Sequence, residues 1–342
     1  MDIATLKSRL KSGEVGGWYI FAGEEDYLKR HYLGELRRAI VTDEVFSTFN
    51  HLLIDGADID FAELKEAIKS PPMMSDYKLI EWKFANLDGL KESEKALLLD
   101  LVSLKEEYPS TVFAIMTASD GFDTGTAKRP SRLAARLSDG FDIINFSKST
   151  DAQLVAWLKR HFDAEKISSS PAVLNALVFR SGRSMEVLVE EVNKLSAFVK
   201  SAGREELLIS DVESVASSTH ESDAFLFSNA VIERNIGKAF AALSDLKQRR
   251  VEPQIVLAML ERTYSELLAA SMLMDEGGGV AEIESILKFH PFKAKLYASS
   301  AKRAGTKRLA EASAELRRID ASSKSGGLSG YGPIEMFITR RI

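Results

Sequence analysis

The stretch Trp18-Tyr19-Ile20-Phe21-Ala22-Gly23-Glu24-Glu25-Asp26 decides the class of fold. Five consecutive apolar residues followed by a glycine are typical of a buried strand that ends in a tight turn. From Asp26 to about Val41, apolar residues recur at helical spacing. A strand that passes directly into a helix predicts the first unit of an α/β domain.

The following hundred residues repeat this alternation. Further strands are predicted at 49–54, 78–82, 111–118 and 141–146, with helices at 61–70 and 92–104. The run 111–118 is the most apolar and predicts the most deeply buried strand. Pro71-Pro72 ends the helix predicted at 61–70. Strands that alternate with helices predict a mostly parallel sheet in residues 1–148.

After Phe146 only helical patterns remain. Thr150 and Gln153 form a capping box, Ser170-Pro171 is an N-cap followed by proline at N1, and a further capping box is expected at Ser210 and Glu213. These signals predict a small helical domain at 149–217. Glycines at 277–279 and 326–327 divide a larger helical domain, 218–342, into separate helices. The predicted class is therefore α/β followed by all-α.

Composition excludes several classes of function. The chain has no cysteine, so disulfides, thiolate metal sites and cysteine nucleophiles are excluded. It shows neither an apolar leader nor a run of roughly 18 apolar residues, which leads us to expect a cytoplasmic protein.

The charge of the chain is uneven. The net charge is −5, yet residues 290–342 hold eleven Lys and Arg against four Asp and Glu. Basic side chains at this end are candidates for contact with DNA phosphates, although solvated faces of amphipathic helices are the favoured interpretation. The candidates are Lys302, Arg303, Lys307, Arg308, Arg317 and Arg318.

The turn after the first strand tests for nucleotide binding. A P-loop needs G-x-x-x-x-G-K-[ST], whose amides and lysine hold the phosphates. Here Gly23 is followed by three carboxylates, which would repel a polyphosphate. Asp120-Gly121, after the most apolar run, is interpreted as a turn and not as a magnesium ligand. The five histidines lack ligand spacing, so we predict no catalytic residue, metal or cofactor.

Met73 and Met74 are the most notable surface feature. They follow Pro71-Pro72 and lead into the strand that begins near Lys78. Unbranched, polarizable side chains in a loop can enter an apolar groove of a partner protein. Packing beneath the edge of the sheet is the alternative reading of the same pair.

Several short patterns follow one another in a specific order. They are Trp18–Leu28, Pro72–Ile80, Ala156–Leu158, Gly182-Arg183, Glu190–Leu195, Ile209–Val212, Asp223–Phe225, Gly237–Ala239, Phe289–Lys293 and Asp320 with Lys324–Gly326. Together they resemble the delta subunit family of bacterial DNA polymerase III. The resemblance implies an AAA+-like domain with a degenerate P-loop at 1–148, a helical lid domain at 149–217 and a helical collar domain at 218–342.

The same resemblance implies a function without catalysis. A delta subunit of the clamp loader binds and opens the beta sliding clamp during DNA replication, and needs no cofactor of its own. The residues that match the clamp-binding motif are Pro72, Met73 and Met74, while Tyr77 stands where a basic residue is usual. The implied partners are the beta clamp, the ATP-hydrolysing gamma/tau subunits, delta-prime, and primed DNA through the assembled loader.

Three alternatives stay open. The chain could be an AAA+ ATPase that binds ATP through an unusual phosphate loop, or a DNA-binding helical scaffold that uses its basic end. The sister delta-prime subunit is the third, but that family carries a cysteine zinc module and this chain has no cysteine.

Overall fold

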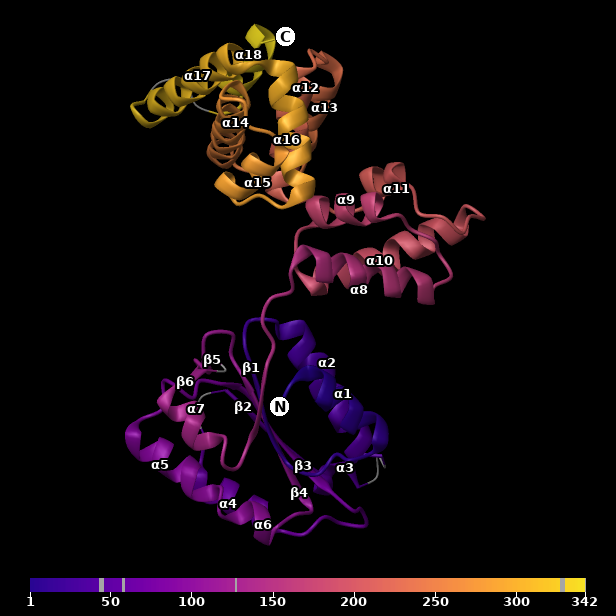
Figure 1. The fold of residues 1–342 in the computed structure, drawn as a ribbon, viewed down its shortest axis with the longest axis vertical. Helices are drawn as coiled ribbons and strands as arrows, with labels where there is room; N and C mark the ends of the chain where they lie inside the picture. Colours follow the sequence, from indigo (N-terminus) through magenta and orange to yellow (C-terminus); the bar gives the residue numbers. More distant parts are fainter. Residues whose placement is uncertain (43–45, 57–58, 127, 327–329, 342) are drawn as a thin grey trace. The chain divides into compact units, whose positions relative to one another are not determined.

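The computed structural model describes residues 1–42, 46–56, 59–126, 128–326 and 330–341. The chain forms two compact units, Met1–Ser149 and Thr150–Ile342 (Figure 1). The further division of the second unit into a lid and a collar stays a prediction.

The first unit is a sheet covered by helices on both faces (Figure 1). Its strands lie in the order β2-β3-β4-β1-β7 and all neighbouring pairs are parallel, as expected for an AAA+-like domain. The elements are α1 (Ile3–Ser12), β1 (Trp18–Ala22), α2 (Asp26–Ile40), α3 (Ser47–Asn50), β2 (His51–Asp55), α4 (Phe61–Lys69), β3 (Lys78–Ala85), α5 (Glu92–Leu101), α6 (Leu104–Glu107), β4 (Thr111–Thr117), β5 (Gly125–Thr126), β6 (Arg129–Pro130), α7 (Arg132–Leu137) and β7 (Asp142–Asn145).

The side chains of β1 point alternately to the two faces of the sheet, and this explains why the whole strand is apolar. Trp18 and Ile20 pack into one core, which α4, α5 and α7 help to form, whereas Tyr19 and Phe21 pack into a second core with α1 and α2. Both faces of the strand are thus buried, as in other parallel sheets. All seven residues of β4 are buried too, which confirms the prediction from its apolar run.

Three boundaries in the first unit differ from the prediction by two or three residues, one of them being the end of β3, which continues to Ala85. The strand expected from Phe49 begins at His51, because Ser47–Asn50 forms a short helix. The helix expected at 92–104 ends at Leu101, and a separate turn of helix follows at Leu104–Glu107. The difference at His51 matters for function, because it changes where the Asn50 side chain can reach.

The regular elements of the second unit that the structure describes are helices, apart from an isolated parallel β-bridge between Ser168 and Glu206 (Figure 1). The capping box of Thr150 and Gln153 and the N-cap Ser170 are confirmed by their hydrogen bonds. The helices are α8 (Asp151–Ala164), α9 (Pro171–Ser181), α10 (Met185–Ser201), α11 (Ile209–Val215), α12 (His220–Ile232), α13 (Ile236–Gln248), α14 (Pro253–Asp275), α15 (Val280–Leu287), α16 (Pro291–Ala304), α17 (Thr306–Lys324) and α18 (Gly332–Arg341).

The capping box expected at Ser210 and Glu213 is wrong. The N-cap is Leu208, two residues before the expected Ser210, so the helix begins at Ile209. Its first turn is capped by Asp211, which accepts a hydrogen bond from the amide of Leu208 at 2.9 Å. Arg204 holds the same carboxylate through two hydrogen bonds.

The glycine breaks define the ends of two long helices. Glycines 277–279 separate α14 from α15, as predicted, and α17 ends just before Gly326. Gly327 lies outside the described residues. In the part of the chain that the structure describes, no helix is both long and apolar enough to cross a membrane.

Candidate functional site

The turn that follows β1 is closed against the neighbouring strand. The amide of Glu25 donates to the carbonyl of Phe146 at 2.9 Å, and the amide of Phe146 donates to Ala22 at 2.7 Å. Gly23 has φ +99°, and a Cβ atom there would lie 2.5 Å from the Phe146 carbonyl oxygen. Glycine is therefore required for the close approach, and the turn has none of the open backbone cradle of a P-loop.

An internal ion pair lies beside this turn. Lys29 is fully buried, and its Nζ lies 2.8 Å from both Asp26 Oδ1 and the Thr117 carbonyl oxygen. The Ser119 hydroxyl donates to the other Asp26 oxygen at 2.9 Å. Burial raises the pKa of Asp26, but the bonds from Lys29 and Ser119 outweigh it, so the pKa lies below its ordinary value. No pattern in the sequence predicts that Lys29 is buried.

A cavity of about 510 Å³ opens at the carboxyl ends of β1, β4 and β7. Its lining carries the carboxylates of Glu24, Asp120 and Asp123 and one ammonium, that of Lys148, which lies 3.9 Å from Glu24. Asp120 lies in a turn, as predicted, closed by a hydrogen bond from the Gly121 amide to the preceding strand end. The excess of negative charge disfavours a nucleotide phosphate here.

The methionine loop, residues 71–77, joins α4 to β3 and presents two apolar side chains to solvent. The exposed fractions are 45% for Met73 and 84% for Met74, and Pro72 is half-buried. Met74 has a left-handed backbone with φ +53°, which is uncommon for a residue other than glycine. Met74 is therefore not packed beneath the edge of the sheet, which was the alternative interpretation of this pair.

Two side chains hold the base of the methionine loop. Lys78 is buried, and its ammonium donates to the carbonyls of Ala67 and Ser70 and, at 2.7 Å, to the Ser70 hydroxyl. Burial lowers the pKa of Lys78 to about 8. The Asn50 carboxamide donates to the Met73 carbonyl and accepts from the Met73 amide, both at 2.7 Å. Neither role was predicted, because neither residue belongs to a local motif.

The six basic candidates lie on α16 and α17. Arg303 donates to Glu233 at 2.6 Å and to Asn229 at 2.8 Å, so its charge is engaged within the unit. Lys302 and Lys307 are exposed and have no ion-pair partner among the described residues. Arg317 and Arg318 are exposed and bond to carbonyls of their own helix, and Arg308 is half-buried.

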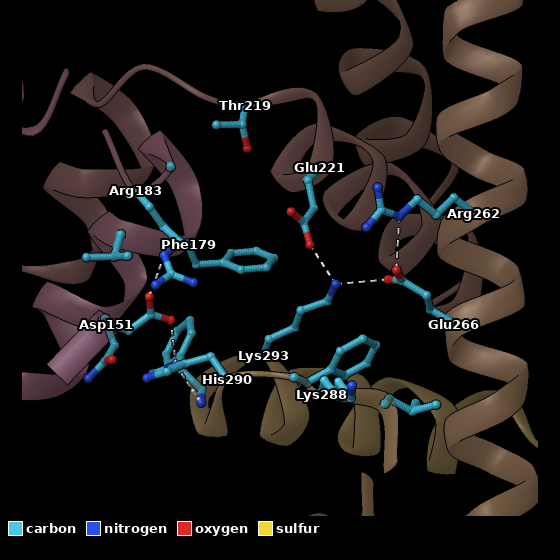
Figure 2. A pocket seen from close by; sticks show the side chains of 16 residues that line it. Asp151, Phe179, Arg183, Thr219, Glu221, Arg262, Glu266, Lys288, His290 and Lys293 are labelled. Carbon is cyan, nitrogen blue, oxygen red and sulfur yellow. Dashed lines mark hydrogen bonds and ion pairs between the residues drawn. The ribbon is translucent and has the colours of Figure 1, made fainter. Parts of the chain in front are cut away.

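A second cavity, of about 560 Å³, lies in the second unit (Figure 2). In Figure 2, Lys293 points between two carboxylates, with Nζ 2.6 Å from Glu221 and 3.0 Å from Glu266. The same ammonium lies 4.1 Å from the centroid of the Phe289 ring, a cation–π contact.

On the opposite side of this cavity, Asp151 binds two groups from distant parts of the sequence. Its carboxylate lies 2.9 Å from Arg183 and 3.5 Å from His290 (Figure 2). The cavity thus joins two of the short patterns identified in the sequence, Gly182-Arg183 and Phe289–Lys293, to the start of α8 at Asp151. Most of its charged groups are paired with one another, which is typical of a structural joint between helices.

No cluster of three or more potential metal ligands occurs among the described residues. His51 lies 3.3 Å from the buried Glu81, and His290 is paired as described above.

Comparison with known proteins gives concordant matches along the chain. The family profile described as DNA polymerase III, delta subunit, matches residues 19–129, and that of the DNA polymerase III delta subunit, C-terminal domain, matches residues 221–341. The chain is 24% identical over 339 residues to DNA polymerase III subunit delta of Bacillus subtilis (strain 168), covering 96% of this chain and 94% of that protein.

A solved structure supports the fold over nearly the whole chain. The Bacillus subtilis DNA clamp loader delta protein gives a TM-score of 0.58 at 21% identity, covering 99% of this chain and 98% of its own. The RuvB Holliday junction branch migration motor of Thermotoga maritima gives a TM-score of 0.37 at 10% identity, covering 87% and 83%. The predicted AAA+-like α/β domain followed by an all-α region is confirmed.

Proposed function

Because the chain belongs to the DNA polymerase III delta subunit family, we propose that it is a non-catalytic clamp-loader subunit that binds and opens the beta sliding clamp during DNA replication. Its partners would be the clamp, the ATP-hydrolysing gamma/tau subunits and delta-prime. It would act in the cytoplasm, on primed DNA held by the assembled loader.

The observation that carries this proposal is the exposure of Met73 and Met74 on a loop with a fixed backbone. Met74 is 84% exposed, yet Met73 before it is hydrogen-bonded to Asn50 of α3, and Ser75 after it donates to the Tyr77 carbonyl at the end of the loop. A large apolar side chain held away from its own core favours a role as an anchor in a partner's pocket. Pro72, which precedes the pair, restricts the direction in which the loop leaves α4.

The proposed mechanism requires no hydrolysis by this chain. A protein that binds the open form of a ring more tightly than the closed form shifts the ring toward opening, by an amount equal to the difference in binding free energy. The closed turn at Gly23 and the acidic cavity beside it support the absence of ATP chemistry here. Access to the methionine loop would then be controlled by the ATP-hydrolysing partner subunits.

Clamp capture by the full chain tests the proposal. We expect Met74→Glu to weaken capture of the cognate clamp by at least tenfold, since it would place a carboxylate in an apolar pocket. Met272→Glu is the matched control, because Met272 is also exposed, at 50%, but lies on α14 of the second unit. Absence of clamp binding by the wild-type chain would overturn the function, and equal capture by Met74→Glu would overturn the site.

A further inference from the structure

The backbone of the methionine loop is held by a side chain from another part of the sequence. Asn50 is only 4% exposed and ends the short helix α3. Its Nδ2 donates to the Met73 carbonyl and its Oδ1 accepts from the Met73 amide, each at 2.7 Å. A primary carboxamide is a neutral group that supplies both a donor and an acceptor in a single plane. The carboxamide of Asn50 therefore matches the backbone of Met73, which offers one carbonyl acceptor and one amide donor.

The residue next to this pair has a conformation that needs support. Met74 has φ +53°, where the Cβ of an ordinary residue crowds the backbone. Its side chain is 84% exposed, so packing within the chain contributes little to fixing it. Sparsely populated backbone conformations persist only where the surroundings determine them. The bonds of Asn50 to the preceding residue are an immediate source of that support, and Lys78 holds the other end at Ser70.

We propose that Asn50 is a positioning residue for clamp binding, which keeps Met74 in its binding conformation before the clamp arrives. This inference rests on the proposed function of the methionine loop. A loop ordered in advance loses less conformational freedom on association, so that the complex is tighter. When Asn50 is removed, the binding conformation becomes one of several, and the apparent affinity falls in proportion to its population.

The experiment measures the affinity of the full chain for the cognate clamp in a double-mutant cycle of Asn50→Ala and Met74→Ala. We expect Asn50→Ala to weaken binding roughly tenfold, as a fall of the competent population to about a tenth would do. In the Met74→Ala background the same change should have little further effect, because the side chain being positioned is already missing. Effects that simply add would overturn the inference, since Asn50 would then act independently of Met74.

A second variant and a second readout distinguish loss of positioning from loss of folding. Asn50→Asp keeps the size and the acceptor for the Met73 amide but replaces the donor with an oxygen that repels the Met73 carbonyl, so we expect it to weaken binding as well. Hydrogen exchange at the Met73 amide should accelerate in Asn50→Ala, which removes its acceptor, while α2 and α4 stay protected in both variants. Wild-type affinity in Asn50→Asp would overturn the positioning role. A Met74→Ala variant that binds normally would instead overturn the proposed site, which separates the two failures.

Discussion

The buried carboxylate of Glu81 accepts two hydrogen bonds from the guanidinium of Arg37, at 2.6 and 2.7 Å. Glu81 lies in β3, directly after the methionine loop, and Arg37 lies in α2, which begins at the closed turn after β1. A bidentate pair of this kind fixes the direction as well as the distance of its partners. The pair therefore joins α2, which begins at the closed turn, to β3, which follows the methionine loop.

The pH dependence of stability should report this ion pair. Burial alone would raise the pKa of Glu81, but His51 and Arg37 outweigh it and lower the pKa to about 2, from an ordinary value of 4.5. Because the folded pKa is depressed, the stabilisation is present above about pH 4.5 and is lost as the pH falls toward 2. We expect Glu81→Gln to lower the free energy of unfolding by about 3 kcal/mol at neutral pH.

Urea unfolding of wild type and Glu81→Gln between pH 3 and pH 7 measures this dependence. The difference in unfolding free energy should shrink as the pH falls. Glu66→Gln is the control, because Glu66 is exposed on α4 and pairs only with Lys69 of the same helix. A difference that stays constant across this range would contradict the assignment.

Nucleotide should leave the thermal stability of the chain unchanged. The turn at Gly23 is closed onto Phe146, and Lys29 pairs with Asp26 inside the protein, so this lysine is not available to bind phosphates. We expect no shift of Tm with millimolar Mg-ATP, whereas a ligand at 100 times its Kd would add about 2.7 kcal/mol to the unfolding free energy. An ATP-hydrolysing loader subunit, measured in parallel, provides the positive control. A magnesium-dependent rise in Tm would favour the ATPase alternative.

The sequence predicted those parts of the fold whose signals are local. The apolar run of β1, the buried strand β4 and the capping box at Thr150 each depend on residues within a few positions of one another, and all three are confirmed. The boundary at His51 was missed because β-branched and aromatic residues near Phe49 favour a strand, while contacts with the methionine loop favour a turn of helix.

The supports of the candidate site could not be predicted, because they join residues that are distant in the sequence. Asn50 reaches Met73 only after β2 and β3 have paired, and Lys29 reaches Thr117 only once α2 packs on β4. A lysine in a helix rich in charged residues is normally interpreted as solvated. The hydrophobic pattern of the sequence therefore does not indicate that Lys29 is buried. Side-chain hydrogen bonds of this kind form only where the fold brings distant residues together, so no local pattern predicts them.

Salt dependence of DNA binding should separate the basic candidates. Lys302 and Lys307 are exposed and are not ion-paired within the described residues, whereas Arg303 is held by Glu233 and Asn229. We expect Lys302→Gln with Lys307→Gln to reduce the slope of log affinity against log salt by up to about 2 in the assembled loader. Arg303→Gln is the matched control and should change the slope little. Equal slopes for wild type and the double variant would exclude both lysines from phosphate contact.

The cavity of Figure 2 should behave as a joint that Lys293 stabilises. Its side chain is 12% exposed and lies between Glu221 and Glu266, over the ring of Phe289. Lys293→Met keeps much of the volume but leaves Glu266 with Arg262 as its remaining cation, at 3.1 Å. We expect a loss of about 1–3 kcal/mol in the stability of the second unit, because a half-buried carboxylate loses a charged hydrogen bond.

Hydrogen exchange measures this loss where it occurs. Amides of α12, α14 and α16 should exchange faster in Lys293→Met, because these three helices carry the carboxylates and the lysine. Arg262→Met serves as the matched control: Arg262 pairs with the same Glu266, but its side chain is 73% exposed, so its removal should accelerate exchange less. Strands β1 and β4 of the first unit should be unaffected in both variants. Equal acceleration by the two substitutions would mean that the burial of Lys293 adds nothing to its ion pair.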